Sequence, residues 1–125
     1  MLYDITRTIT PQTAVWPGDS TFQAQPVLQI GPDSVVNLYT LTLSAHTGSH
    51  ADASYHFSAD GADPASMPLD AYMGPARVVT VDKDGPLYPD DLAHVALAGG
   101  QRLLIHSTVS DLPDDQWPQS FPYLS

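Results

Sequence analysis

The sequence contains no cysteine and no glutamate, and only four lysine and arginine residues among 125. Without cysteine there is neither a disulfide framework nor a thiolate metal site, so any metal must be held by histidine and carboxylate. Fourteen aspartates bring the formal net charge to −10. A surface that binds nucleic acid or an anionic membrane needs clustered cations. The composition therefore excludes both of these partners.

Long apolar runs are also missing. No run approaches the roughly 18–20 residues of a membrane span, and the start of the chain lacks the basic and apolar regions of a signal peptide. We therefore expect a soluble, cytoplasmic protein. The length and the hydrophobic content of 42% suit one compact domain over residues 1–125. The acidity indicates solubility or, alternatively, an acidic site that concentrates divalent cations.

Turn-forming residues are abundant, since the chain has 12 prolines and 8 glycines beside its aspartates. This composition favours strands and turns over long helices. Alternating or β-branched apolar residues predict strands over 2–6, 22–30, 76–82 and 102–107, and Pro26 restricts the second of these to a sheet edge. A helix is predicted over 89–97 and a single helical turn over 68–73. A tight turn is predicted at 31–34.

The stretch from Ser44 to Phe57 carries three of the five histidines and an aspartate. His46, His50, Asp52 and His56 are spaced by four, two and four residues. In an extended chain these even spacings place all four side chains on one side, whereas a helix would turn Asp52 away from His50. The pattern predicts a strand with a polar face, interrupted by a bend at Gly48.

Imidazole and carboxylate are the ligands that Zn²⁺ prefers, with Mn²⁺ and Fe²⁺ as alternatives. His46, His50 and Asp52 are therefore candidate ligands of a metal that activates water. His56 is either a further ligand or a general acid/base that transfers a proton. The alternative is a polar strand whose histidines only form hydrogen bonds. Trp16 beside the Pro17-Gly18-Asp19 turn either covers the core or forms one wall of a ligand pocket.

The segment from His46 to His56 resembles the signature His-x-Gly-Thr-His-x-Asp-x-Pro-x-His of the cyclase-family metal hydrolases. This family includes the bacterial kynurenine formamidases, also called arylformamidases. The resemblance continues in the same order through residues 3–6, the Trp16-Pro17-Gly18-Asp19 turn, residues 69–79 and the end of the chain at 121–125. It therefore extends over essentially the whole chain.

The resemblance implies the α/β class, with a swivelling β/β/α domain, a mostly mixed or antiparallel sheet and few helices. It implies one or two zinc ions, or manganese, held by His46, His50 and Asp52. His56 would be the catalytic acid/base, and Trp16 would line an aromatic pocket. The implied reaction is hydrolysis of N-formyl-L-kynurenine to L-kynurenine and formate in tryptophan catabolism. The substrate is a small aromatic formamide, and the protein is expected to form a homodimer or a higher homo-oligomer.

Two departures from the family pattern bear on the site. Ser54 stands where the signature has proline. Family members also continue beyond the position of Ser125 and supply a further histidine and a glutamate to the metals. We therefore expect the chain to be the N-terminal part of a longer domain, truncated at its C-terminus. His94 and His106 do not stand in the context of the later ligands, and we predict structural roles for both.

Three other functions remain open on the sequence alone. The same motif serves other amide or lactam hydrolases, including enzymes similar to isatin hydrolase, because the motif determines the metal chemistry and the pocket determines the substrate. The chain is otherwise a metal-binding fragment without catalysis, or an acidic β domain with a purely structural role.

Overall fold

Strands predominate in the computed structural model, which describes residues 1, 3–96, 98–99 and 102–125. The helical elements among the described residues are four short 3₁₀ turns. This content agrees with the predicted α/β class with few helices, while the swivelling β/β/α arrangement stays a prediction. The chain divides into a first compact unit, Met1–His50 with Pro113–Trp117, and a second, Ala51–Leu112 with Pro118–Ser125. No described helix has the length and apolarity to cross a membrane.

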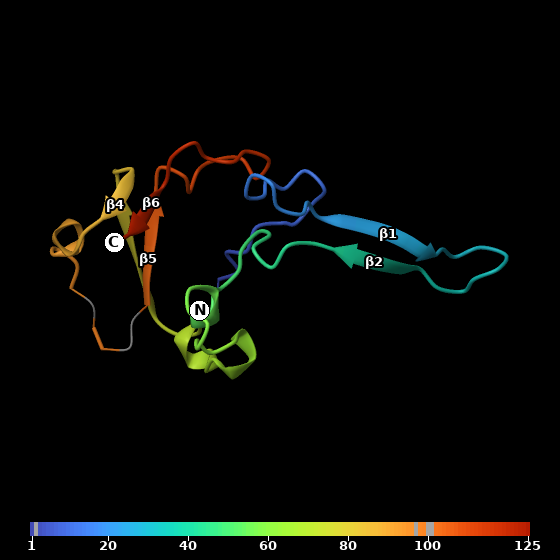
Figure 1. The fold of residues 1–125 in the computed structure, drawn as a ribbon, viewed down its shortest axis with the longest axis horizontal. Coiled ribbons are helices and arrows are strands. Elements are labelled where there is room, and N and C mark those ends of the chain that lie inside the picture. The colour runs from blue at the N-terminus through green and yellow to red at the C-terminus, as the bar shows by residue number, and fades with distance from the viewer. Residues whose placement is uncertain (2, 97, 100–101) are drawn as a thin grey trace. The chain divides into compact units, whose positions relative to one another are not determined.

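The first unit contains an antiparallel hairpin of β1 (Gln23–Leu28) and β2 (Leu38–Thr42), shown in Figure 1. Its register is irregular between Pro26 and Leu28. Proline has no N–H to donate, so it is tolerated where a strand pairs on one side. The predicted edge strand over 22–30 is confirmed. The predicted turn at 31–34 is confirmed as well, since the Gly31 N–H donates to the Ser34 carbonyl at 3.0 Å.

The predicted strand over 2–6 is wrong for its described residues, 3–6, which form no regular element, and residue 2 lies outside the described part. Asp4 instead accepts hydrogen bonds from the Thr6 hydroxyl at 2.6 Å and the Thr6 N–H at 2.9 Å. These bonds hold the pKa of the Asp4 carboxyl below its usual range. A local aspartate turn has therefore replaced the strand ladder, as short polar side chains often do.

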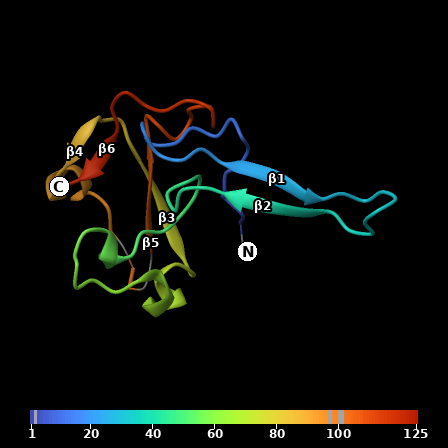
Figure 2. The ribbon, with the colours of Figure 1, turned by 45° about the vertical axis from the view of Figure 1, so that its right-hand side comes forward.

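The second unit is built on two parallel strand pairs, drawn in Figure 2. β3 (Ala76–Val81) pairs with β5 (Arg102–Ser107), and β4 (Gly85–Leu87) pairs with β6 (Pro122–Leu124). The predicted strands over 76–82 and 102–107 are thus confirmed. Their parallel pairing requires the long connection that separates them in the sequence.

The predicted helix over 89–97 is much shorter in the structure. Only the 3₁₀ turn η4 (Pro89–Leu92) forms, and residue 97 lies outside the described part. Asp91 accepts the Tyr88 N–H at 2.8 Å and the Lys83 ammonium at 2.6 Å, which stabilises the first turn alone. Nucleation of a helix is unfavourable, and a short helix without stabilising tertiary contacts gains too few hydrogen bonds to offset it. The predicted turn over 68–73 is confirmed as η3 (Leu69–Ala71).

The remaining 3₁₀ turns, η1 (Ser54–His56) and η2 (Pro64–Ser66), precede β3 in the second unit. The Asp63 carboxylate caps η2 by accepting the Ser66 N–H at 2.8 Å. In the same unit, Asp84 accepts the Thr108 hydroxyl at 2.7 Å and the Ser120 hydroxyl at 2.8 Å. These two bonds lower the pKa of the Asp84 carboxyl. They also join the β3–β4 connection to the segments after β5 and before β6.

Candidate metal centre

The stretch with the candidate ligands is a turn rather than the strand that its even spacings predict. β2 ends at Thr42, and residues 45–49 form turns and bends. The Ser44 hydroxyl accepts the His46 N–H at 3.1 Å, and the Ser44 carbonyl accepts the Thr47 N–H, also at 3.1 Å. Gly48 has φ +65°, which confirms the predicted bend there. Bonds within the turn therefore prevent the backbone from continuing as a strand.

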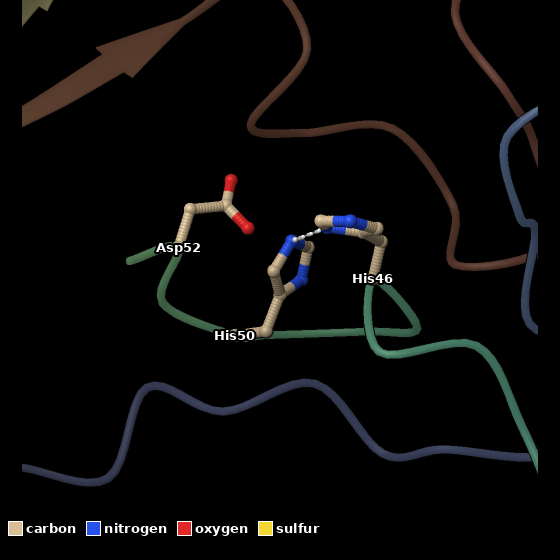
Figure 3. Close-up of side chains that lie close together, drawn as sticks. All are labelled: His46, His50 and Asp52. Carbon is tan, nitrogen blue, oxygen red and sulfur yellow. Dashed lines mark hydrogen bonds between the residues drawn. The ribbon is translucent and has the colours of Figure 1, made fainter. Parts of the chain in front are cut away.

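This turn brings three candidate ligands together within seven consecutive residues. One ligand atom from each of His46, His50 and Asp52 lies within 4.8 Å of the others. His46 Nδ1 is 3.1 Å from His50 Nε2, and the ring centroids are 5.0 Å apart. Figure 3 shows both imidazoles and the carboxylate on the same side of the loop. The candidate set derived from spacing is therefore close in space, although a different backbone geometry places it there.

The other ring nitrogen of His50 has a partner that suits a metal ligand. His50 Nδ1 lies 2.9 Å from the Gly48 carbonyl oxygen. A proton on Nδ1 donates to this carbonyl and leaves the lone pair on Nε2, which is the usual way in which a ligand imidazole is oriented. Two nitrogens and a carboxylate form a donor set that fits Zn²⁺ or Mn²⁺. The chemistry of the three residues therefore fits a divalent cation.

Asp19 lies close to Ser44, just before this turn, whereas the sequence placed it only in a loop. The nearby Ser44 hydroxyl is the main cause of the lowered pKa of the Asp19 carboxyl, followed by the hydrogen bond that Asp19 Oδ1 accepts from the Ser20 N–H at 2.7 Å. Ser44 Oγ in turn accepts the His46 N–H at 3.1 Å. Ser44 is therefore close to both the Asp19 carboxylate and the backbone of His46. No spacing rule links residues so far apart in the sequence, and so this connection was missed.

His56 is not a member of the group of three. It ends η1, and its ring lies edge-on to Phe57 with centroids 4.3 Å apart. Ser54 begins the same turn, and its hydroxyl accepts the Ala62 N–H at 2.9 Å. A serine at this family proline position thus holds the backbone through a hydrogen bond. The acid/base role of His56 stays a prediction.

The two remaining histidines also lie outside the group. His106 is on β5, with Nε2 3.5 Å from Asp111 Oδ1, and His94 lies in the turn after η4. Their predicted structural roles stay predictions.

Trp16 is 55% exposed, which disfavours the alternative that it covers the core. Its ring meets Trp117 with centroids 5.5 Å apart and an interplanar angle of 74°. The sequence contained no signal for this pairing, because contacts between distant loops leave no periodic pattern.

Replacing Gly48 with alanine is expected to weaken zinc binding. A side chain at φ +65° is strained by about 1–2 kcal/mol, and the new Cβ would lie 3.0 Å from Ile9 Cγ1. Relief of the strained φ and of this contact requires movement of the turn between His46 and His50 or of the Ile9 side chain. Competition with a chromophoric chelator measures the affinity. Gly85→Ala is the matched control, because Gly85 has φ +79° with no atom within 4 Å of the new Cβ. Equal losses in both variants would contradict a local effect on the ligands.

Comparison with known proteins identifies the family of the chain. Residues 3–125 match the sequence model of the family described as putative cyclase. The chain is 44% identical over 121 residues to a protein named kynurenine formamidase from Maricaulis maris (strain MCS10), covering 96% of this chain and 57% of that protein. It is 40% identical over 121 residues to a kynurenine formamidase from Salinibacter ruber (strain DSM 13855 / M31), covering 95% and 57%. The chain thus spans a little more than half the length of these relatives. Since the match extends from residue 3 to residue 125, the chain belongs to the putative cyclase family.

Proposed function

We propose that the protein is a zinc-dependent arylformamidase that hydrolyses N-formyl-L-kynurenine to L-kynurenine and formate in tryptophan catabolism. One observation carries the proposal. His46, His50 and Asp52 lie within 4.8 Å of one another in a chain that is 44% identical to a kynurenine formamidase. The donor set supports the metal chemistry, and the similarity to named relatives supports the substrate. Manganese is the alternative metal.

The roles of the residues follow from their chemistry. A divalent ion bound here would polarise the formyl oxygen and lower the pKa of a water molecule. His46 and His50 would supply nitrogen ligands, with His50 oriented by the Gly48 carbonyl at 2.9 Å. Asp52 would supply oxygen and could join two ions.

His56 is assigned to the proton transfer. In the overall reaction water adds to the formyl carbon, the carbon–nitrogen bond breaks, and the aniline nitrogen gains a proton. A neutral aniline leaves far more readily than its anion, so a group that holds this proton accelerates the step. An imidazole takes up and releases protons near neutral pH, which suits this task.

Turnover of N-formyl-L-kynurenine and isatin by the purified, zinc-loaded protein tests the proposal. We expect formate and L-kynurenine from the first compound, with the activity lost after chelation and restored by zinc. Hydrolysis of isatin alone would contradict the formamidase assignment and favour a lactam hydrolase. Bound zinc with turnover of neither compound would favour a metal-binding protein without catalysis.

A further inference from the structure

The only two tryptophans of the chain form a contact that the roles assigned above do not use. Trp16 and Trp117 meet edge to face, with centroids 5.5 Å apart. This geometry is typical of a favourable aromatic pair. The contact is not part of a buried core, because Trp16 is 55% exposed and Trp117 is 40% exposed. The pair therefore presents aromatic surface that remains accessible within the first unit.

Trp117 is held beside Trp16 by the residue three positions before it. The Asp114 carbonyl accepts the Ala14 N–H at 2.8 Å, and the Asp114 carboxylate pairs with the Arg7 guanidinium at 2.5 Å. A backbone bond and an ion pair thus fix the segment 113–117 on the N-terminal residues of the first unit. The position of Trp117 consequently does not depend on the contact between the rings alone.

Trp16 belongs to a tight turn whose last residue, Asp19, lies close to the turn that carries the candidate ligands. The Asp19 N–H donates to the Trp16 carbonyl at 2.9 Å and closes the tight turn. The nearby Ser44 hydroxyl lowers the pKa of the Asp19 carboxyl, and Ser44 Oγ accepts the His46 N–H at 3.1 Å. The loop that carries Trp16 therefore lies close to Ser44, which bonds to the backbone of the candidate ligand His46.

We propose that Trp117 is a second substrate-binding residue, which forms with Trp16 a platform for the planar ring of an aryl amide. The proposal rests on the proposed function and deepens it, because it selects aryl over alkyl amides. A planar ring against two indoles gains both buried apolar area and the favourable geometry of aromatic contacts. An N-alkyl amide such as N-methylformamide buries much less apolar area and makes no ring contact.

Kinetics with formanilide and N-methylformamide test the proposal in the zinc-loaded protein. Trp117→Ala is expected to raise KM for formanilide roughly 2–10-fold, the range that corresponds to the loss of an aromatic contact. The KM for N-methylformamide is expected to stay at the wild-type value. Trp117→Phe keeps a ring and is expected to retain most of the aryl preference. Tyr123→Leu is the matched control, because the Tyr123 ring contacts the Phe121 ring in the second unit, with centroids 6.5 Å apart. This variant is expected to change KM for neither substrate.

A loss shared equally by both substrates, or no change in either, would overturn the role of Trp117. Binding of the probe acetanilide, measured by saturation-transfer NMR with acetamide as reference, provides a readout that needs no turnover. Acetanilide binding that is lost in Trp117→Ala supports the platform, even if the protein hydrolyses no formamide. That combination would contradict the proposed function and leave the platform supported. Formamide turnover without any preference for aryl amides would leave the function intact and contradict the platform.

Discussion

Replacing Asp52 with alanine is expected to abolish zinc binding. Asp52 supplies the only carboxylate of the three-residue group, and the atoms of the group lie within 4.8 Å of one another. The variant retains two imidazole nitrogens, too few for the three protein ligands that a catalytic zinc site usually has. Elemental analysis of the purified variant is expected to give the metal content of a chelator-treated sample, with formamidase activity lost in parallel.

Asp60→Ala is the matched control for this variant. Asp60 is exposed, lies eight residues further along the chain and is outside the group, so its replacement changes the net charge equally. We expect its metal content to equal that of the wild type. An Asp52→Ala protein that keeps its zinc would show that the metal is bound elsewhere, and equal losses in both variants would indicate a general effect of the acidic surface.

Replacing His56 with alanine is expected to lower the rate by about 10²–10⁴-fold, the usual contribution of a general acid/base, while the metal content stays at the wild-type level. His56 lies outside the three-residue group and on η1, so its removal takes no donor atom from that group. The loss is expected in kcat rather than in KM, because proton transfer belongs to the chemical step. Rate measurements and elemental analysis on the same preparation check both expectations.

His94→Ala is the control for His56→Ala, because it removes a histidine that has no assigned catalytic role. The activity of this variant is expected to match that of the wild type. A His56→Ala protein that also loses its metal would contradict the division into three ligands and one proton-transfer residue. His56 would then be a ligand, the alternative that the sequence left open.

The strands that could be predicted from the sequence are those set by continuous local patterns. Val78, Val79 and Thr80 form a β-branched run between turn signals, and the strand appears where it was expected. The predicted helix over 89–97 has start and stop signals in the sequence, but the regular turn ends at Leu92 and none of its residues is buried. Start and stop signals report on the ends of a helix, whereas its length depends on tertiary contacts that a sequence pattern does not contain.

The candidate ligands could be predicted from the sequence, but the geometry that unites them could not. Even spacing puts His46, His50 and Asp52 on one side of an extended chain, and the turn over residues 45–49 achieves the same grouping. Ser44 favours the turn over the extended strand, because its hydroxyl and its carbonyl both accept hydrogen bonds from backbone N–H groups within the turn. Trp117 was missed as a partner of Trp16, since contacts between distant loops leave no trace in local periodicity.

Zinc titration followed by NMR of the histidine side chains tests the central claim most directly. The chain has five histidines, of which only His46 and His50 are proposed as imidazole ligands. We predict that the ring signals of these two shift together and saturate at stoichiometric zinc, while those of His94 and His106 stay in place. Equal shifts of all five histidines, or none at His46 and His50, would contradict the metal centre.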